Sequence, residues 1–389
     1  MELVDLISLR PVPCAGVLLM LTQRCPLHCA HCSTASTMAG PQTDAAALHR
    51  LVGSFGPENR PELVMFTGGE PLLRPGLVTE LARAAAARGV RTALLSGMFF
   101  ARHERIAPHI QEAIRSVDHF SASLDREHER EVPRAEVLRT LATLLDDGMA
   151  VSLHLTGHGA DDPYLAEVTA QVRRRFGDRV PMLVNEVRAV GRATSWATAA
   201  RIAAGPDKAS ESTPDRTRVL PCAMAAWPVV AADGTVLACC GQDAVDRRPA
   251  PEHLLLGNIA EDDWPTLRER ALNSPELRMI RALGPLHLRS RFGDGDTGPD
   301  GYCAACLALP QSTDLPAIRA FGAGPAGDLL DRHATRTQAE AGPVALVRRF
   351  GCAEYAELVA PGGASSGAPG GALGGALGGA PSGAPGGPR

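Results

Sequence analysis

Short apolar runs alternate with longer stretches of mixed apolar and polar residues over the first 190 residues of the chain. The apolar runs have the length of buried β-strands, and the stretches between them have the length and composition of helices. Helix signals support this division: Asp44 lies near the start of one stretch, Pro75 begins another, and Gly89 follows its end. The pattern predicts strands over residues 16–22, 63–67, 92–96, 117–124, 151–156 and 182–187, separated by helices over 43–54, 75–88, 102–115, 133–147 and 163–176.

Strands that alternate with helices in this way indicate an α/β fold with a parallel sheet and right-handed connections. Six such units can form an open doubly wound sheet or a partial (β/α)6 barrel of the TIM type. In both folds the site lies at the C-terminal ends of the strands. A cysteine-rich loop, the stretch Gly68–Pro71, Ser96 and the stretch Ser123–Asp125 all fall at those ends. We therefore expect a single site there.

The rest of the chain has a different pattern. Residues 205–220 are polar and contain two prolines, which is typical of a linker. Residues 227–237 predict a hairpin that turns at Asp233-Gly234. The last residues are nearly all Gly, Ala, Pro and Ser, and such a segment cannot bury a core. The expected organisation is a core at 14–204, a linker at 205–220, a second cysteine-bearing domain at 221–312, a helical segment at 313–360 and a disordered tail at 361–389.

Composition limits the possible functions. The 389 residues carry a net charge of −4, which argues against a general nucleic-acid binder. No apolar run reaches the roughly 18 residues needed to span a bilayer, and the first ten residues lack the features of a secretory signal. We therefore expect a soluble, cytoplasmic protein with no membrane partner. In a reducing cytosol its ten cysteines indicate metal binding or redox chemistry in place of disulfides.

The first cysteine group is Cys25, Cys29 and Cys32, with C-x3-C-x2-C spacing. Three thiolates on one short loop can hold three irons of a cubane cluster and leave the fourth iron open to a small molecule. The alternative is a zinc site, which needs a fourth ligand that His28 or His31 could supply. The spacing alone leaves both possibilities open.

The sequence context adds a resemblance. The cysteine triplet follows the first predicted strand, and Thr67-Gly-Gly-Glu-Pro71 ends the second. Over residues 14–195 the chain resembles the radical S-adenosylmethionine (SAM) superfamily. This resemblance implies the partial (β/α)6 barrel, of the two possible folds, and an enzyme whose three cysteines hold a [4Fe–4S] cluster that binds SAM. It also implies reductive cleavage of SAM to a 5′-deoxyadenosyl radical, which takes a hydrogen atom from the substrate.

The resemblance also implies which residues contact SAM. The GGEP stretch is expected near the amino group, with serines and an aspartate after the third and fourth strands near the ribose or carboxylate. Ser and Asp at strand ends are also common turn formers, so the second set has a purely structural alternative. The expected SAM-binding residues are Gly68, Gly69, Glu70, Pro71, Ser96, Ser123 and Asp125.

The second cysteine group combines Cys222 and Cys239, separated by a C-x11-G-x4-C pattern, with a later C-x2-C pair, Cys303 and Cys306. Four cysteines in two pairs can ligate zinc or an iron–sulfur cluster. The opening pattern resembles the SPASM auxiliary domain of radical SAM enzymes. Because Ser312 stands where that domain would continue with cysteine, the pattern resembles its shortened form, called twitch. That resemblance implies one auxiliary [4Fe–4S] cluster, fully ligated and used for electron transfer.

Three other cysteines have weaker signals. Cys240 could replace Cys239 as a ligand, donate a hydrogen atom, or be a small buried residue. Cys14 and Cys352 are expected to be buried small residues.

Together these features predict a radical SAM enzyme that oxidises, crosslinks or epimerises a natural-product substrate. The substrate is either a ribosomal peptide or a sugar or aminocyclitol, and a flavodoxin or ferredoxin is the expected one-electron reductant. The alternative is a non-catalytic scaffold that binds zinc through both cysteine groups.

Overall fold

The computed structural model describes residues 1–197, 218–293 and 301–363. All six predicted strands of the core form, and each lies parallel to its neighbour in a curved, open sheet. The predicted α/β fold with a partial barrel is therefore confirmed. The strands are β1 (Gly16–Thr22), β2 (Leu63–Gly68), β3 (Arg91–Ser96), β4 (His119–Asp125), β5 (Val151–Gly157) and β6 (Met182–Glu186).

The helices between these strands also follow the sequence signals. The Asp44 side chain accepts hydrogen bonds from the backbone N–H groups of Ala46 and Ala47 and thereby caps the first of these helices. One helix is shorter than predicted, because Phe99–Arg102 form a separate 3-10 turn and the helix begins only at Pro108. The helices are α2 (Ala45–Gly53), α3 (Pro75–Ala86), α4 (Pro108–Arg115), α5 (Arg134–Asp146) and α6 (Pro163–Phe176), preceded by the unpredicted α1 (Leu3–Ser8).

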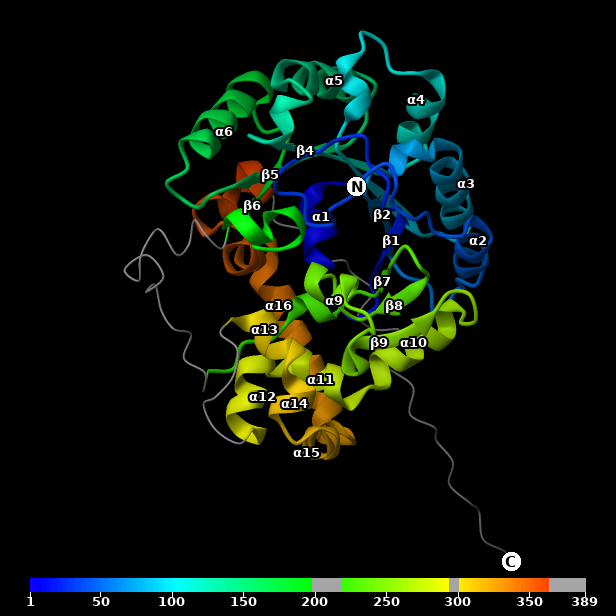
Figure 1. The fold of residues 1–389 in the computed structure, drawn as a ribbon, viewed down its shortest axis with the longest axis vertical. Helices are drawn as coiled ribbons and strands as arrows, with labels where there is room; N and C mark the ends of the chain where they lie inside the picture. Colours follow the sequence, from blue (N-terminus) through cyan, green and yellow to red (C-terminus); the bar gives the residue numbers. More distant parts are fainter. Residues whose placement is uncertain (198–217, 294–300, 364–389) are drawn as a thin grey trace, which may run out of the picture.

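The two faces of the sheet have different surroundings. Figure 1 shows α2–α6 along the outer side of the curved sheet and α1 on its inner side. On β5, Leu153 and Leu155 are buried in the apolar core. His154 and Thr156 point to the other face and remain partly exposed, although the strand lies between two neighbours. The inner face is therefore the place where the sheet offers polar side chains to a ligand.

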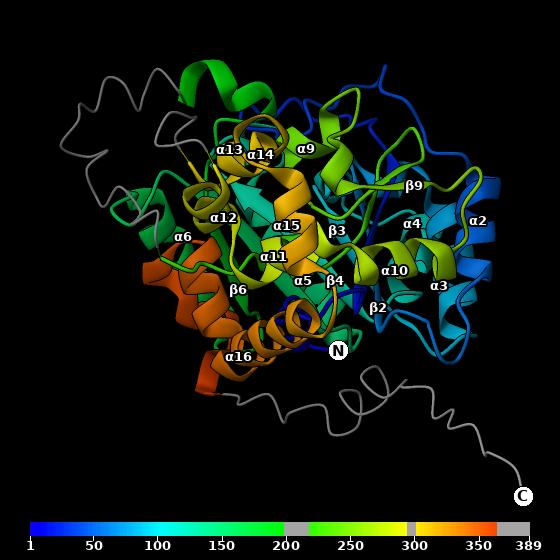
Figure 2. The ribbon, with the colours of Figure 1, turned by 90° about the horizontal axis from the view of Figure 1, so that it is seen from below.

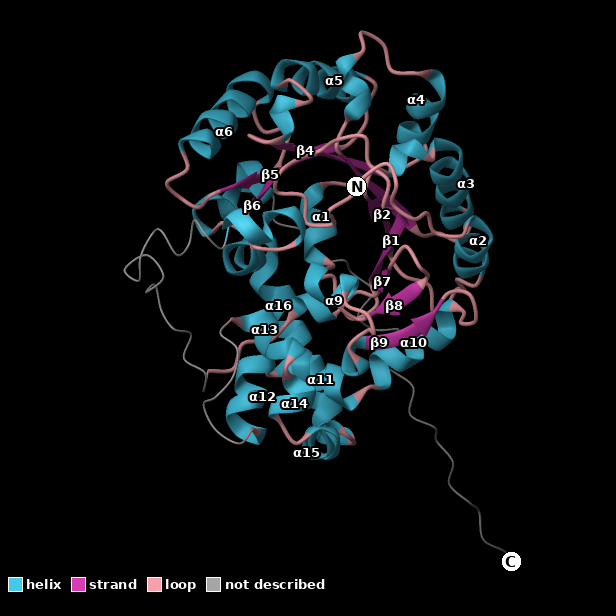
Figure 3. Cartoon of the chain, in the orientation of Figure 1, coloured by secondary structure: helices cyan, strands magenta, loops and turns pink. Residues whose placement is uncertain are grey.

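The sheet does not end at β1. β7 (Val229–Val230) pairs in parallel with β1, and β8 (Thr235–Leu237) and β9 (Leu255–Asn258) continue it antiparallel, in the order β6-β5-β4-β3-β2-β1-β7-β8-β9 (Figure 3). The predicted hairpin is present, and Gly234 has the positive φ of 82° that its turn requires. Local sequence patterns gave no sign that this hairpin would join the core sheet.

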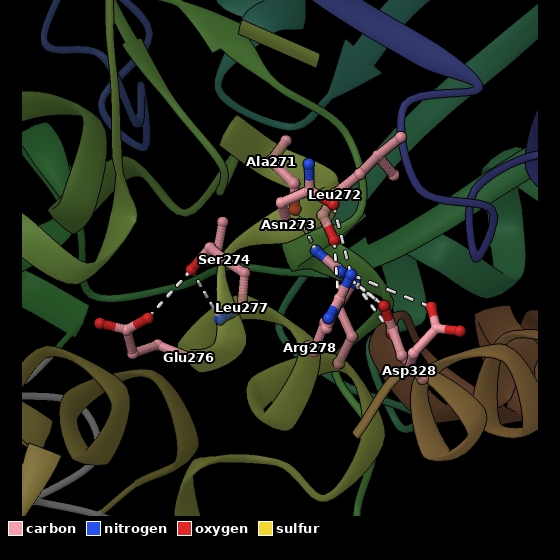
Figure 4. Close-up of polar contacts among 10 residues, drawn as sticks. Ala271, Leu272, Asn273, Ser274, Glu276, Leu277, Arg278 and Asp328 are labelled. Atoms are coloured by element: carbon pink, nitrogen blue, oxygen red, sulfur yellow. Dashed lines mark hydrogen bonds and ion pairs between the residues drawn. The ribbon is translucent and has the colours of Figure 1, made fainter. Parts of the chain in front are cut away.

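The second half of the chain is mainly helical (Figure 2). Arg278 joins three of its helices: it donates hydrogen bonds to the Leu272 carbonyl (2.9 Å) and the Asn273 side chain (3.3 Å) and faces Asp328 at 3.9 Å (Figure 4). Ser274 caps the helix that carries Arg278. The helices are α9 (Gln242–Asp246), α10 (Trp264–Asn273), α11 (Pro275–Ala282), α12 (Pro285–Phe292), α13 (Tyr302–Leu307), α14 (Leu309–Ser312), α15 (Leu315–Gly322) and α16 (Pro325–Phe350).

Some sequence predictions fall outside the described residues. Most of the predicted linker lies within 198–217, and all but the first three residues of the predicted tail lie within 364–389. The domain boundaries stay a prediction. Among the described helices, none combines the length and the apolar character required to cross a bilayer.

Candidate functional site

The first cysteine group lies on the loop that follows β1, at the C-terminal edge of the sheet. Cys25 is buried, whereas Cys29 and Cys32 are partly exposed. The backbone N–H of Leu27 points at the Cys25 sulfur at 3.4 Å, and the Cys32 sulfur lies 3.3 Å from the Thr34 hydroxyl. Short contacts within one loop therefore position the three thiols.

The segment after β6 lies at the same C-terminal end of the parallel strands and holds this loop. Arg192 donates from Nε to the Cys29 carbonyl (2.9 Å) and from its backbone N–H to the Cys32 carbonyl (3.0 Å). Trp196 donates to the Ala30 carbonyl at 3.0 Å. Gly191 has a φ of 55°, and a Cβ added there would lie 2.4 Å from the Cys32 carbonyl oxygen. Sequence reasoning missed this contact, since no local pattern joins residues so far apart.

Two thiols of this loop, Cys25 and Cys29, are harder to ionise than a free cysteine. Burial raises the pKa of Cys25 to about 11, and burial together with Asp125 and Glu131 raises that of Cys29 to about 12. Iron–sulfur clusters and metal ions bind the thiolate form and supply the missing positive charge. The donor set therefore fits a metal cofactor.

The geometry bears on which cofactor fits. Among residues 1–197, 218–293 and 301–363, no three His, Cys, Asp or Glu side chains converge closely enough to hold a single metal ion. A zinc site needs four ligands about 2.0–2.3 Å from one ion. In a cubane cluster each thiolate ligates a different iron, so the sulfurs stand farther apart. That the three cysteines hold a [4Fe–4S] cluster and not zinc stays a prediction.

Gly68 and Gly69 bring β2 against the cysteine loop. The N–H of Gly69 donates to the Thr22 carbonyl (2.7 Å), and that of Glu70 donates to the Arg24 carbonyl (2.8 Å). A Cβ on Gly68 would lie 2.3 Å from the Thr22 carbonyl oxygen, and one on Gly69 would lie 2.4 Å from that of Arg24. The two glycines thus allow β2 to approach the backbone of the cysteine loop closely. Their contact with SAM stays a prediction.

Glu70 is fully buried at the start of the short 3-10 turn Pro71–Leu73. Its carboxylate accepts hydrogen bonds from the Leu72 N–H (3.0 Å), the Ser96 hydroxyl (3.0 Å) and the Gly97 N–H (2.8 Å). Burial raises the pKa of Glu70 to about 7 against the opposing effect of these donors. Glu70 and Ser96, two predicted site residues, are thereby brought together, and each is bonded to the protein.

Asp125, at the end of β4, is bonded to the cysteine loop. Its Oδ2 lies 3.2 Å from His31 Nε2, and its Oδ1 accepts from the backbone N–H of His128 at 2.8 Å. Burial disfavours the charged carboxylate, but these partners hold the pKa of Asp125 below its ordinary value. Ser123 lies two residues earlier on the inner face and is partly exposed. A role for either residue in SAM binding stays a prediction, and the His31 contact was not foreseen.

The second cysteine group is assembled from three separate segments. Cys222 precedes β7, Cys239 follows β8, and Cys303 and Cys306 lie in α13. Burial raises the pKa values of Cys222, Cys239 and Cys306, and neighbouring thiols of the same group raise them further. The fold therefore brings the four thiols of this group together, and a bound cation would favour the thiolate forms of Cys222, Cys239 and Cys306.

Cys240 makes different contacts from Cys239. Arg10 Nη2 donates to the Cys240 sulfur at 2.7 Å, and the thiol lies 3.8 Å from the Met224 sulfur. Cys240 also packs beside Leu18 and Met20 of the inner face. Its direct contacts therefore differ from those of Cys239, although its thiol lies close enough to act electrostatically on Cys239 and Cys222.

Residues 19–172 match the family model of the radical SAM superfamily. This part of the chain is a radical SAM domain. A curated relative, the AdoMet-dependent heme synthase of Methanosarcina barkeri, is 38% identical over 112 residues, which cover 27% of this chain and 29% of that protein. The match therefore spans less than a third of the relative's length.

Solved structures of low sequence identity also resemble the fold. Streptococcus suis SuiB bound to SAM gives a TM-score of 0.48 at 13% identity, covering 70% of this chain and 69% of SuiB. anSMEcpe with bound AdoMet and a peptide gives 0.45 at 12% identity, covering 76% and 97%. BtrN in complex with AdoMet and 2-DOIA gives 0.34 at 14% identity, covering 71% and 89%. None of these three TM-scores reaches 0.5, so the assignment rests on the sequence match to the domain.

Proposed function

We propose that the protein is a radical SAM enzyme that acts on a natural-product substrate by oxidation, crosslinking or epimerisation. The observation that carries the proposal is the cysteine loop after β1, held against the GGEP stretch of β2 inside a radical SAM domain. When bound, a [4Fe–4S] cluster and SAM supply reductive cleavage to methionine and a 5′-deoxyadenosyl radical. Cys25, Cys29 and Cys32 would hold that cluster.

The residues around the loop have supporting roles in this proposal. The buried Glu70 ties the ends of β2 and β3 together through Ser96 and Gly97. Asp125 orients His31 and thereby the cysteine loop. The partly exposed side chains of the inner face, among them Ser123 and His154, would face SAM and the substrate. The curved sheet would surround the reacting atoms and exclude water from them.

The second cysteine group would hold an auxiliary [4Fe–4S] cluster through Cys222, Cys239, Cys303 and Cys306. Four thiolates, one for each iron, leave no open position, so this cluster would transfer electrons and would not bind SAM. The contacts of Cys240 with Arg10 and Met224 favour Cys239 as the ligand from the adjacent pair.

Two substrate classes remain under this proposal, a ribosomal peptide and a sugar or aminocyclitol. A flavodoxin or ferredoxin would supply the electron. The competing function is a zinc-binding scaffold without catalysis, which would require the match of the GGEP stretch to be accidental.

The test is anaerobic reconstitution with iron and sulfide, followed by reduction in the presence of SAM. We expect about eight irons per chain and formation of 5′-deoxyadenosine. About four irons with 5′-deoxyadenosine would retain the radical SAM activity and remove the auxiliary cluster. Tightly bound zinc without iron uptake or SAM cleavage, under conditions where a known radical SAM enzyme is active, would support the scaffold.

A further inference from the structure

The second cysteine group is surrounded by nitrogen donors. Three side chains from different parts of the chain approach its sulfurs or the adjacent Cys240: Arg10, which precedes β1, Arg188, which follows β6, and His253, which precedes β9. Two of them carry a full positive charge. None of the three forms an ion pair with a carboxylate among the described residues, although Asp243 acts electrostatically on Arg188, and Glu252 and Glu276 act on His253.

Arg10 is the most deeply buried of these donors, with 7% of its surface exposed. One Nη atom contacts the Cys240 sulfur at 2.7 Å, and the guanidinium stacks over Trp227 at 4.8 Å from the ring centre. The other Nη atom is buried and has no hydrogen-bond partner among the described residues. A buried cation is costly unless negative charge lies nearby. Thiolates that ligate a cluster would provide that charge.

Arg188 and His253 approach the pair on α13. Arg188 donates from Nη2 to the Cys303 sulfur at 3.2 Å. His253, which is 5% exposed, has Nε2 4.0 Å from the Cys306 sulfur. Its other ring nitrogen, Nδ1, is buried and has no hydrogen-bond partner among the described residues. The tautomer with its proton on Nε2 therefore allows the ring to donate a hydrogen bond to the Cys306 sulfur. Two donors from outside the group thus point at two of the four expected ligands.

The first cysteine group has mostly the opposite surroundings. The carboxylates of Asp125 and Glu131 act on Cys29, and that of Glu70 acts on Cys25. Adding an electron to a cluster adds negative charge. Nearby carboxylates oppose this addition, whereas guanidinium groups and N–H donors to sulfur favour it. The two sites therefore differ in the direction in which the protein shifts the reduction potential.

We infer that Arg10, Arg188 and His253 raise the reduction potential of a cluster on Cys222, Cys239, Cys303 and Cys306 above that of the first cluster. This inference rests on the proposed function, because it requires the auxiliary cluster. Arg188 and His253 act as tuning groups through two of the ligand cysteines, and Arg10 acts from its contact with the adjacent Cys240. Arg10 has the least screened charge because it is buried, while the charge of the more exposed Arg188 is partly screened by water.

The test is a redox titration followed by electron paramagnetic resonance. The full-length chain with Cys25, Cys29 and Cys32 all changed to Ala isolates the signal of the second cluster. In that background we expect Arg188→Gln to lower the midpoint potential and Arg188→Lys, which keeps the charge, to lower it less. Arg247→Gln is the matched control: it removes a positive charge from an exposed position that contacts no thiol. Its midpoint should stay close to that of the parent.

Arg10→Gln should lower the midpoint further, but the buried stacking of Arg10 on Trp227 makes that variant prone to misfolding. The Arg188→Gln variant is therefore the one that decides the test. A midpoint in Arg188→Gln equal to that in Arg247→Gln, with the cluster still bound, would overturn this inference and leave the auxiliary cluster in place. A parent that binds no iron after reconstitution would overturn the auxiliary cluster and the inference together.

Discussion

The two cysteine groups differ in how the chain assembles them and in what surrounds them. Cys25, Cys29 and Cys32 lie within eight residues on one loop, whereas the second group draws on segments from Cys222 to Cys306. Carboxylates stand near the first group, whereas one guanidinium contacts Cys303 of the second group and another contacts the adjacent Cys240. The comparison shows that one fold can place similar thiols in electrostatic surroundings of opposite sign. Clusters of the same type could then differ in potential.

The largest expected effect separates the two groups by function. Cys29→Ala should abolish 5′-deoxyadenosine formation, because the cluster would lose one of its three protein ligands. Cys303→Ala should remove the second cluster and reduce the iron content toward about four per chain, while SAM cleavage continues. Iron analysis and chromatographic assay of 5′-deoxyadenosine after anaerobic reconstitution measure both changes. Retention of SAM cleavage in Cys29→Ala would refute the assignment of the first group.

The next prediction tests the contact between the cysteine loop and the segment after β6. In Gly191→Ala the new Cβ would lie 2.4 Å from the Cys32 carbonyl oxygen, at a φ of 55° that disfavours any side chain. We expect a cost of roughly 2 kcal/mol or more in the free energy of unfolding, together with reduced iron in the first group only. Denaturant unfolding and iron analysis check it. Gly148→Ala, also at a positive φ but with no atom near its Cβ, is the control for backbone strain alone. Equal losses in both variants would contradict a role for this contact.

A third prediction concerns the buried carboxyl of Glu70. Burial raises its pKa from 4.5 to about 7, so between these values the folded chain holds a proton that the unfolded chain has released. The contribution of this proton to the free energy of unfolding is fully present below pH 4.5 and is lost as the pH rises through about 7. In the cluster-free protein we expect the native chain to lose at most about 3 kcal/mol relative to Glu70→Gln between pH 5 and pH 8.

Urea unfolding of both proteins at the two pH values measures this difference. Glu112→Gln changes a glutamate in an exposed pair with Arg83 and should give the same pH dependence as the native chain. If the difference in free energy of unfolding between the native chain and Glu70→Gln were the same at pH 5 and pH 8, the hydrogen bonds would keep Glu70 ionised in the folded protein.

The smallest expected effect concerns the carboxylate near the first group. Asp125→Asn removes a negative charge close to Cys29 and weakens the contact with His31. We expect the midpoint potential of the first cluster to rise and SAM cleavage to slow by several-fold, with the second cluster unchanged. Redox titration of the Cys303→Ala background isolates the first cluster. A fall in its midpoint would contradict the proposed electrostatic contrast.

Several features could be read from the sequence because they depend on local patterns. The strands of the core follow from short apolar runs, and the hairpin follows from Asp233-Gly234. The first cysteine group and GGEP identify the radical SAM domain, and the family match confirms it. The start of α4 was predicted too early, at residue 102, because residues 102–107 include good helix formers although Pro108 begins the helix.

Other features depend on contacts between distant segments. No local pattern indicates that Arg192 binds the cysteine loop, that β7 pairs with β1, or that Arg10 faces Cys240. Each contact joins residues far apart in the chain. Many other acceptors could bind the same donor, and many other strands could pair with the same strand edge. Only packing of the whole chain selects among them.

By itself, the sequence determined the α/β class, the positions of the core strands along the chain and the identity of the thiols, because hydrophobic period and cysteine spacing are properties of neighbouring residues. The tertiary structure alone decided which charges surround each thiol group. Those charges come from residues before β1 and after β4 and β6, and electrostatic interaction depends on distance in space and not on separation along the chain.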